Sequence, residues 1–303
     1  MKKISVVPFL TVLILTLALP DNTQANNVYV SLGNTVYRID QSGNSSVLAA
    51  GLVGGASGLA IATSGELYVK STDTIHRITT NGAVSTFVQD GLLNGGGALA
   101  FDSVGNLYAA NGGSTNVVKI TPLGEVSIYA PSALFGSNVH HMTGLAFDSL
   151  NNLYVSTWDD RSVLKIEPNG SSSVFYQDAS VVTAGLAFDN TGNLFVANFI
   201  GASVVKITAE GVASPFALGN GLEGPWGLAA GQDNNLYSAN YPAVGNNAVL
   251  EIDSTGNVST YAEGVGGNGG GLSYVAVVPE PSTYALLLLS GAASLWALKR
   301  RKS

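Results

Sequence analysis

The sequence predicts an all-β fold made of one short unit repeated six times, and three observations lead to this prediction. A phrase of the form Gly-Leu-Ala-Phe-Asp, a Gly-Asn or Asn-Asn turn, and Leu-Tyr-Val-Ala-Asn recurs along the chain. Its apolar segments are rich in Val, Ile and Tyr, which favour strands. Gly, Asn, Asp or Ser interrupts them every few residues, as turns require, and between the two chain ends no stretch keeps a 3.6-residue apolar period.

The spacing of the repeat predicts the architecture. The aromatic residue of the Leu-Tyr step recurs at intervals of 39, 40, 46, 41 and 42 residues. Its six positions are Tyr29, Tyr68, Tyr108, Tyr154, Phe195 and Tyr237. A strand of the type Val-Lys-Ile follows each position, and then a strand that ends in an aromatic residue. Four short strands in a unit of about 40 residues, repeated six times, are typical of a six-bladed β-propeller.

The repeat also predicts how the ring closes. The first copy begins at residues 28–30 and lacks its Gly-Leu-Ala-Phe strand, whereas a matching segment stands at residues 271–276. We therefore expect this C-terminal strand to complete blade one as its innermost strand, beside the N-terminal strand. Such closure leaves no open sheet edge at the joint. Truncation before Gly271 should consequently open the ring and destabilise it.

The N-terminal 25 residues are typical of a signal peptide with a signal helix. Lys2 and Lys3 precede an apolar stretch at residues 4–19, and residues 23–25 offer small side chains to a signal peptidase. An uncleaved N-terminal anchor is the alternative. The chain has no cysteine, so an exported form needs no disulfides, and thiolate chemistry is excluded.

The C-terminal residues 279–303 combine three features in one order. Pro279, Glu280 and Pro281 precede an apolar run at residues 284–298, and four basic residues follow it at once. The run predicts a transmembrane helix, although it is somewhat shorter than the roughly 20 residues of a straight span. The basic residues mark the cytoplasmic side. The prolines keep the approach to the helix extended, so that a peptidase could reach the backbone.

This order of parts resembles the PEP-CTERM sorting signal of Gram-negative bacteria. The resemblance implies that the tail holds an exported protein in the inner membrane until an exosortase-type peptidase cuts near the Pro-Glu-Pro, and that the protein then reaches the cell surface or extracellular matrix. A plain tail anchor that is never cut is the alternative. The chain therefore divides into a signal peptide (1–25), a propeller (26–278) and a sorting signal with a transmembrane helix (279–303).

The charge of the propeller excludes some partners. Six of the 13 Lys and Arg and two of the 20 Asp and Glu lie in the terminal segments, which leaves seven basic and 18 acidic residues and a net charge near −11. Nucleic acid is excluded because it requires clustered cations. Anionic polysaccharide and lipid headgroups are equally unsuitable as direct ligands, unless a divalent cation bridges them.

Asparagines suggest a metal at the channel mouth, where propellers usually bind their ligands. We count the four strands of a blade outward from the channel. In three of the blades strand two is expected to end in an asparagine, at Asn111, Asn198 and Asn240, and amide oxygens suit Ca²⁺. Another divalent metal would use the same ligands, and no cofactor is certain. The alternative is that each asparagine caps a turn.

The repeat at residues 26–278 also resembles the NHL-type propellers and their gluconolactonase-like and virginiamycin-B-lyase-like relatives. Residues 223–226, Glu-Gly-Pro-Trp, resemble the gluconolactonase-like Glu-Gly-Pro-x-Trp signature with one residue missing, before the sixth blade instead of the first. The resemblance implies a divalent-metal site formed by Glu223 and the asparagines. No aspartate occupies a matching strand end, however, and a solvated Glu223 is the alternative.

A second candidate for catalysis is His141. Residues 140–143, His-His-Met-Thr, precede the inner strand of blade four in the longest inter-blade insertion and align with residues 223–226. One of two adjacent histidines can face the channel and act as a base, and lyase-like propellers use histidine. Simple packing of this loop on the rim is the alternative.

For the other polar residues of interest, a structural role is the favoured interpretation. Trp158 and Asp159 suit a sugar ring at the rim, together with Trp226, but an ion pair of Asp159 or Asp160 with Arg161 explains the charges and is favoured. Three aspartates follow phenylalanine and are spaced to accept hydrogen bonds from turn amides. They are Asp102, Asp148 and Asp189.

The sequence thus favours an exported, non-catalytic interaction module, because no complete catalytic set is present. Its partners would be the exosortase-type peptidase and the membrane in passing, and then extracellular polysaccharide or surface proteins. A metal-dependent lactonase-like hydrolase or a lyase, with its site at the channel mouth, is the alternative. A spacer without a specific ligand is the third possibility.

Overall fold

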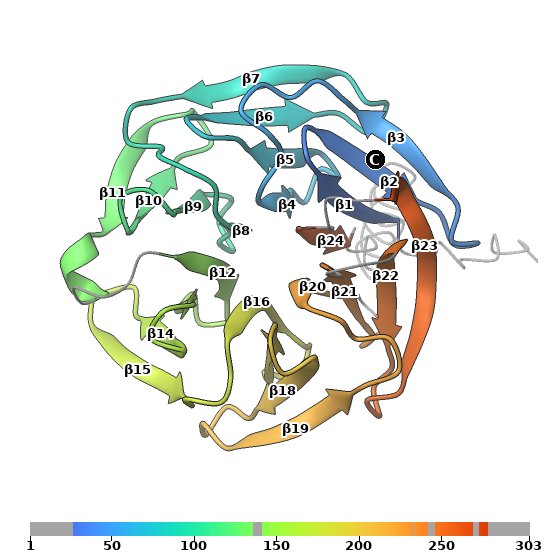
Figure 1. Ribbon diagram of the computed structural model, residues 1–303. Coiled ribbons are helices and arrows are strands. Elements are labelled where there is room, and N and C mark those ends of the chain that lie inside the picture. Colours follow the sequence, from blue (N-terminus) through green and yellow to red (C-terminus); the bar gives the residue numbers. More distant parts are fainter. Residues whose placement is uncertain (1–26, 136–140, 232, 242–245, 269–272, 278–303) are drawn as a thin grey trace, which may run out of the picture.

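The computed structural model describes residues 27–135, 141–231, 233–241, 246–268 and 273–277, which form a ring of six four-stranded antiparallel sheets (Figure 1). The prediction of a six-bladed, all-β propeller is confirmed. Among the residues that the structure describes, no helix combines the length and apolar character needed to cross a membrane. The signal helix and transmembrane helix expected at the chain ends lie outside the described residues.

Each blade holds four short strands, numbered along the chain. Blade one contains β24 (Val275–Val277), β1 (Val28–Leu32), β2 (Thr35–Ile39) and β3 (Ser45–Ala49). Blade two contains β4 (Leu59–Ile61), β5 (Leu67–Lys70), β6 (Thr74–Ile78) and β7 (Val84–Gln89). Blade three contains β8 (Leu99–Phe101), β9 (Leu107–Asn111), β10 (Asn116–Ile120) and β11 (Val126–Ala130).

The second half of the ring follows a 3-10 turn, η1 (Ser132–Leu134). Blade four contains β12 (Met142–Phe147), β13 (Leu153–Thr157), β14 (Ser162–Ile166) and β15 (Ser172–Gln177). Blade five contains β16 (Thr183–Phe188), β17 (Leu194–Asn198), β18 (Ser203–Ile207) and β19 (Ala213–Leu218). Blade six contains β20 (Pro225–Ala230), β21 (Leu236–Asn240), β22 (Asn246–Ile252) and β23 (Val258–Asn268).

The ring has two faces that differ in their loops. Strand one is the innermost strand of each blade and strand two is its neighbour. The face on which a tight turn joins strand one to strand two is called the turn face. The opposite face, on which strand one begins and strand two ends, is called the mouth face. Asp148 shows how these turns are held, because its Oδ1 accepts the backbone N–H of Leu150 at 2.9 Å and of Asn152 at 2.8 Å. Asp102 and Asp189 make the same pattern of bonds to their own turns, so the structural role predicted for these aspartates is confirmed.

The core lies between neighbouring blades, because side chains on both faces of each sheet are buried. Tyr154 of β13 illustrates the packing. Its ring meets Phe175 of the same blade and Phe188 of the next blade edge to face, with centroids 5.0 Å apart in both pairs. Blade faces covered in this way explain why the strands read as nearly continuous apolar runs.

The closure of the ring matches the prediction from the repeat. β24 pairs antiparallel with β1, with Val277 opposite Val28 and Val275 opposite Val30, and forms the innermost strand of blade one. Figure 1 shows β24 beside β1 at the central opening. The strand as described covers Val275–Val277, a shorter stretch than the expected 271–276, and residues 271–272 lie outside the described residues.

Close approach of the innermost strands explains the glycine that opens the Gly-Leu-Ala phrase. A Cβ at Gly144 would lie 2.6 Å from the Ala184 carbonyl oxygen, and one at Gly185 would lie 2.5 Å from the Leu228 nitrogen. Gly227 meets the backbone of Ser273 at 2.8 Å in the same way. In blades four, five and six the inner strand therefore needs a residue without a side chain where the next inner segment passes.

Candidate functional site

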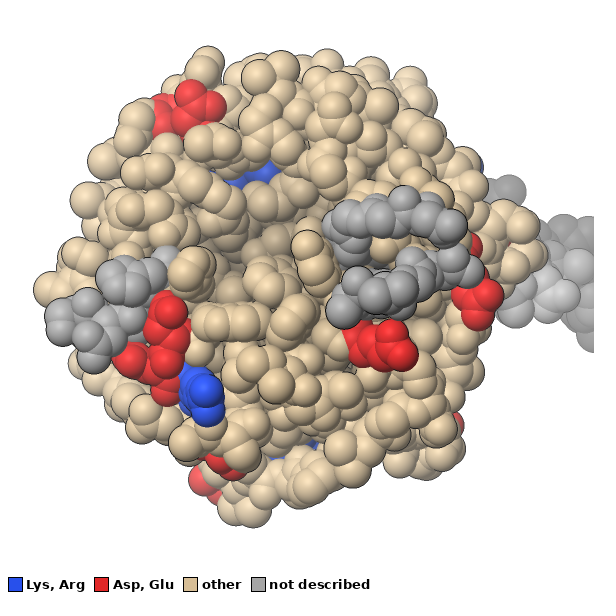
Figure 2. Space-filling model, in the orientation of Figure 1, with Lys and Arg blue, Asp and Glu red and all other residues tan. Residues whose placement is uncertain are grey.

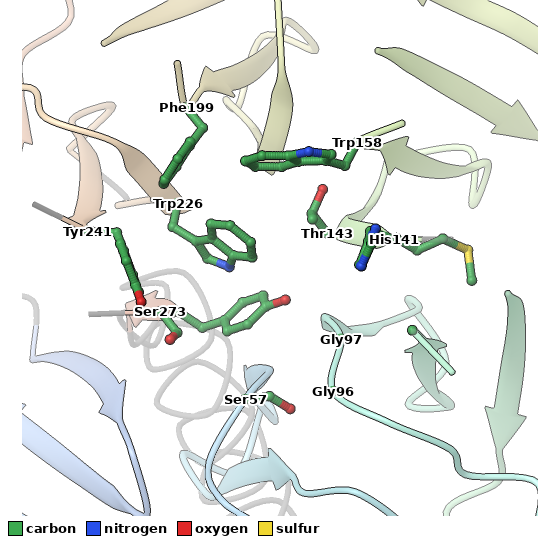
Figure 3. A pocket seen from close by; sticks show the side chains of 13 residues that line it. Ser57, Gly96, Gly97, His141, Thr143, Trp158, Phe199, Trp226, Tyr241 and Ser273 are labelled. Atoms are coloured by element: carbon green, nitrogen blue, oxygen red, sulfur yellow. The ribbon is translucent and has the colours of Figure 1, made fainter. Parts of the chain in front are cut away.

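A cavity of about 570 Å³ opens at the mouth face of the central channel (Figure 3). Its size lies within the range of ordinary ligand pockets, about 300–1,000 Å³. Blades four to six supply one side with large aromatic residues, and blades two and three supply the other with glycine and serine. In the orientation of Figure 2 the centre of the molecule is hollowed, with Asp and Glu at several places around it.

The aromatic side consists of Trp158, Phe199, Trp226 and Tyr241, which we call the aromatic wall. Trp158 lies 5.0 Å from Phe199 and 5.4 Å from Trp226 between ring centroids. Tyr241 extends the group, with centroids 6.1 Å from Phe199 and 6.3 Å from Trp226. Figure 3 shows the four rings side by side along one edge of the cavity. Contacts of this kind fix the rings, so a ligand meets a preformed apolar surface.

Backbone hydrogen bonds position three of these aromatic residues. Trp158, Phe199 and Tyr241 each stand directly after the last residue of strand two. Their backbone N–H groups donate to carbonyls of the segment entering strand one of the same blade, at 3.0, 3.0 and 2.9 Å respectively. The corresponding residues of blades one to three are Gly33, Thr72 and Gly112. Three of the four residues of the aromatic wall therefore come from one repeat position, which is aromatic in half of the ring, and Trp226 comes from β20.

The opposite side of the cavity is a glycine wall formed by Gly96, Gly97 and Gly112, with Ser57 beside them. A Cβ at Gly97 would lie 2.3 Å from the Ala110 carbonyl oxygen, and one at Gly112 would lie 2.8 Å from that of Gly96. A Cβ at Gly96 would meet only the Ser57 side chain, at 3.4 Å. Packing thus requires glycine at two of these positions, while at Gly96 the missing side chain mainly keeps the cavity open.

His141 and Asp159 form a pair at the edge of the cavity. One Asp159 carboxylate oxygen accepts the backbone N–H of His141 at 2.9 Å, and the other lies 3.4 Å from Nδ1 of its ring. The His141 side chain is 66% exposed and lines the cavity. Engagement of Nδ1 by a carboxylate leaves Nε2 as the nitrogen that can exchange a proton with a ligand.

The prediction that Arg161 forms an ion pair with Asp159 or Asp160 was wrong. Among the described residues, Arg161 donates from Nη1 to the backbone carbonyl of Ala179, and Asp159 pairs with His141. Arg161 adopts a positive φ of 53° in the turn after Trp158. Nearness in the sequence therefore did not predict the partner of Arg161.

Two further polar groups lie within the aromatic part of the cavity. Burial raises the pKa of the Tyr274 phenol to about 12, with the nearby Trp226 indole opposing the rise, so the hydroxyl is neutral and can donate. Nε1 of Trp226 is buried and makes no hydrogen bond of ordinary geometry with the residues that the structure describes. Tyr274 precedes β24, so the strand that closes the ring also contributes to the site.

The side chains of the three asparagines predicted as metal ligands make hydrogen bonds that connect two segments of the same blade. Asn111 accepts the N–H of Asn94 at 3.0 Å and donates to the Leu92 carbonyl at 2.6 Å. Asn198 accepts the N–H of Val182 at 3.0 Å. Each bond fastens the end of strand two to the segment entering strand one of the same blade.

Asn240 donates in the same way to the Gly221 carbonyl, at 2.6 Å, although its own Oδ1 is buried and has no hydrogen-bond partner among the described residues. Glu223 is exposed on the segment before β20. Within the described residues, no three His, Asp or Glu side chains gather at one point to hold a metal ion. The asparagine side chains bond backbone groups of their own blades, and nothing in these contacts brings them together with Glu223 around one cation. The divalent-metal site stays a prediction.

Sequence reasoning identified part of this site and missed the rest. It placed Trp158, Asp159 and Trp226 at the rim and His141 over the channel, and the structure puts all four at or beside the cavity. It missed the remaining members, which are Phe199, Tyr241, Tyr274 and the glycine wall. A comparison of the residue after strand two across the six copies would have revealed Phe199 and Tyr241.

Comparison with known proteins shows the fold alone. No family model matches the sequence, and no curated protein sequence matches it significantly. Virginiamycin B lyase from Staphylococcus aureus is similar in structure, with a TM-score of 0.55 and 14% identity over 78% of this chain and 74% of that chain. A streptogramin B lyase gives a TM-score of 0.57 and 17% identity over 78% and 73%.

Two further solved structures cover more of the molecule. A chain of a nidogen/laminin complex gives a TM-score of 0.69 and 15% identity, over 84% of this chain and 98% of that chain. A protein of unknown function from Bacteroides caccae gives 0.63 and 17%, over 84% and 99%. At these identities the likeness extends to architecture and not to activity. The chain is a six-bladed β-propeller with structural neighbours among the NHL-type and streptogramin B lyase propellers.

Proposed function

We propose that this chain is an exported, non-catalytic interaction module that binds a neutral sugar ring of an extracellular polysaccharide at the channel mouth. The observation that carries the proposal is the aromatic wall, which lies across the cavity from the glycine wall. The faces of aromatic rings are electron-rich, and the C–H groups on one face of a pyranose are apolar with a slight positive charge. Stacking of the two is therefore favourable without any charge on the ligand.

Charge and polar groups favour a neutral ring over an acidic one. A propeller with a net charge near −11 disfavours uronic acids and sulfated sugars. Asp159 at the edge of the cavity and the neutral Tyr274 phenol inside it offer an acceptor and a donor for sugar hydroxyls. The cavity is open at the mouth face, so one ring of a longer chain can enter while the remainder stays outside.

Export and sorting are part of this proposal, and support for them comes from the terminal segments. A basic start followed by an apolar stretch precedes the propeller, and Pro279–Pro281 with an apolar run and basic residues follow it. An exosortase-type peptidase and the inner membrane would then be transient partners. The mature ring would reach the cell surface or matrix, where polysaccharide is available.

The test is binding of neutral hexose oligosaccharides to the full chain in detergent, measured by calorimetry and tryptophan fluorescence. We expect Trp158→Ala and Trp226→Ala each to weaken binding at least tenfold, a loss of about 1.4 kcal/mol. Ile200→Ala is the matched control, because this residue is 69% exposed on the mouth face and does not line the cavity. Equal affinity of the wild type and both tryptophan variants, or preference for uronic acid oligomers, would contradict the proposal.

Catalysis of the lyase type is a second candidate, supported by the His141–Asp159 pair. Asp159 engages Nδ1, which leaves Nε2 of His141 available to remove a proton from a bound substrate. One similar structure is a catalytically inactive variant of virginiamycin B lyase from Staphylococcus aureus with quinupristin. Quinupristin is therefore the first substrate to test, by mass spectrometry of the wild type and of His141→Ala. Conversion by the wild type that is lost in the variant would replace the non-catalytic reading.

The metal-dependent, lactonase-like alternative gains no support from the contacts of Glu223 and the asparagines. It remains testable by thermal unfolding of the full chain in EDTA and then in Ca²⁺. A Ca²⁺-dependent rise in Tm that disappears in Glu223→Gln would restore it, since a ligand that binds only the folded state stabilises it.

A further inference from the structure

β24 connects the cavity to the predicted membrane tail. Ser273 and Tyr274, directly before this strand, line the cavity at the mouth face. Val277 at the other end of the strand pairs with Val28, the first residue of β1, where that strand begins on the turn face. The chain therefore enters β24 at the cavity and leaves it on the opposite face of the ring, at the innermost strand position.

The distance from this exit to the apolar run is short. Residues 278–283 separate Val277 from Tyr284, the first residue of the run, and the seven steps from Val277 to Tyr284 span at most about 25 Å when fully extended. A path to the mouth face around the outside of the ring must first pass three more strands of the blade, about 14 Å at ordinary strand spacing. It must then climb the height of a five-residue strand, about 17 Å. The linker is too short for both.

We propose that the tail holds the propeller with its turn face toward the bilayer and its cavity facing away from the membrane. This inference rests on the proposed membrane tail. A ligand-binding mouth that faces away from the bilayer can meet polysaccharide before the tail is cut. Cleavage near Pro279–Pro281 would also leave β24 in the ring, so that the cavity is the same before and after release.

Exposed apolar residues on the turn face fit a bilayer as the adjoining surface. Val104, Leu123 and Leu150 are 73%, 88% and 75% exposed, and all three lie at tips of turns in blades three and four. The turns of Val104 and Leu150 are joined, because the Asn151 side chain bonds the Ser103 backbone N–H at 3.1 Å and its hydroxyl at 2.7 Å. Apolar tips held next to one another suit the interfacial zone of a bilayer.

The absence of cysteine allows a direct test with single labels on the full chain. Leu150→Cys marks the turn face, and Ile200→Cys marks the mouth face at a similar exposure, 75% against 69%. Each variant is labelled with a fluorophore and reconstituted into vesicles that carry a quencher on the lipid headgroups. We expect the label at Leu150 to be quenched several times more strongly than the label at Ile200.

A longer linker provides the matched control. Insertion of 30 Gly and Ser residues after Val278 removes the limit on reach, because a flexible chain of this length spans about 30 Å on average and far more when extended. The difference between the two labels should then shrink. Flotation with the vesicles checks the anchoring separately. A chain that fails to float overturns the membrane tail and this inference with it, whereas a floating chain with equal quenching, or stronger quenching at Ile200, overturns the orientation alone.

Discussion

Val28 and Val277 face each other across the seam that closes the ring, the first residue of β1 paired with the last residue of β24. Both side chains are buried, at 0% and 8% exposure, in a cluster that also includes residues of blade six. The two ends of the propeller thus hold one blade together, and that blade packs on its neighbours. Damage to this strand should affect the whole ring and not one blade.

Val275→Asp tests the seam. The substitution places an unpaired carboxylate at a position that is 6% exposed, and we expect a loss of at least about 3 kcal/mol in the free energy of unfolding. For a domain of this size that corresponds to a fall in Tm of roughly 6–12 °C. Val53→Asp is the control, since Val53 is 82% exposed. Calorimetry that finds similar Tm values for both variants would show that the seam contributes little.

The glycines of the innermost strands predict a second pair of variants. Gly185→Ala should destabilise the ring by about 1–3 kcal/mol, because its Cβ would lie 2.5 Å from the Leu228 nitrogen and 2.6 Å from the Trp226 carbonyl oxygen. Gly91→Ala is the matched control, with no atom within 4 Å of its Cβ and no positive φ. Denaturant unfolding should therefore separate the two, and equal midpoints would refute the close packing of inner strands.

The fold could be predicted from the sequence because each level of the pattern indicates the same structure. Intervals near 40 residues set the number of blades, and the strand missing from the first copy identified β24 as its replacement. No role was assigned from the sequence to the glycine of the Gly-Leu-Ala phrase. Its contact with the next inner strand depends on packing between blades, which a single repeat does not reveal.

The site was harder to predict because it depends on differences between the copies. Asn111 and Asn198 suggested metal ligands by residue type, yet their amides bond backbone groups that only the folded blade brings near. His141 pairs with Asp159, 18 positions along the chain, because strand two returns to the start of strand one. Contacts of this kind follow from the geometry of the blade, which residue type alone does not supply.

Turn aspartates predict a dependence of stability on acid. Burial tends to raise the pKa of Asp189, but hydrogen bonds from Asn193 and Thr191 outweigh it and hold the pKa below its ordinary value. Its stabilising effect is therefore present above pH 4, the region of the unfolded pKa, and is lost as pH falls through the folded value. Asp189→Ala should lower Tm by roughly 2–4 °C at pH 7.

The same comparison at pH 2.5 supplies the control for Asp189. The difference in Tm between wild type and Asp189→Ala should be smaller there than at pH 7, because the stabilisation from a carboxylate with a lowered pKa declines as pH falls below the unfolded pKa. A difference in Tm that does not change between pH 7 and pH 2.5 would mean that the charge of the carboxylate has no part in holding the turn.

Lys70 has an unusual environment for a lysine. It occupies the position in strand two that is Ser31 in blade one and Ser156 in blade four, and it is fully buried. Its Nζ donates to the carbonyl of Gly95, and to that of Ser71 at 3.4 Å. Burial lowers the pKa of the ammonium to about 8, with Asp73 opposing the change. The charged Lys70 ammonium is thus bound by two uncharged acceptors, the carbonyls of Gly95 and Ser71.

This environment predicts that the wild type gains stability as pH rises. Between pH 8 and about 10.4, the ordinary lysine pKa, the unfolded chain binds more protons at Lys70 than the folded chain does. The free energy of unfolding of the wild type should therefore increase, relative to Lys70→Met, by on the order of 1–2 kcal/mol from pH 7 to pH 9.5. Lys70→Ser, which installs the residue of blades one and four, should behave like Lys70→Met. Urea unfolding of the three proteins at both pH values decides the matter, and a constant difference between wild type and variants would show that Lys70 keeps its proton throughout this range.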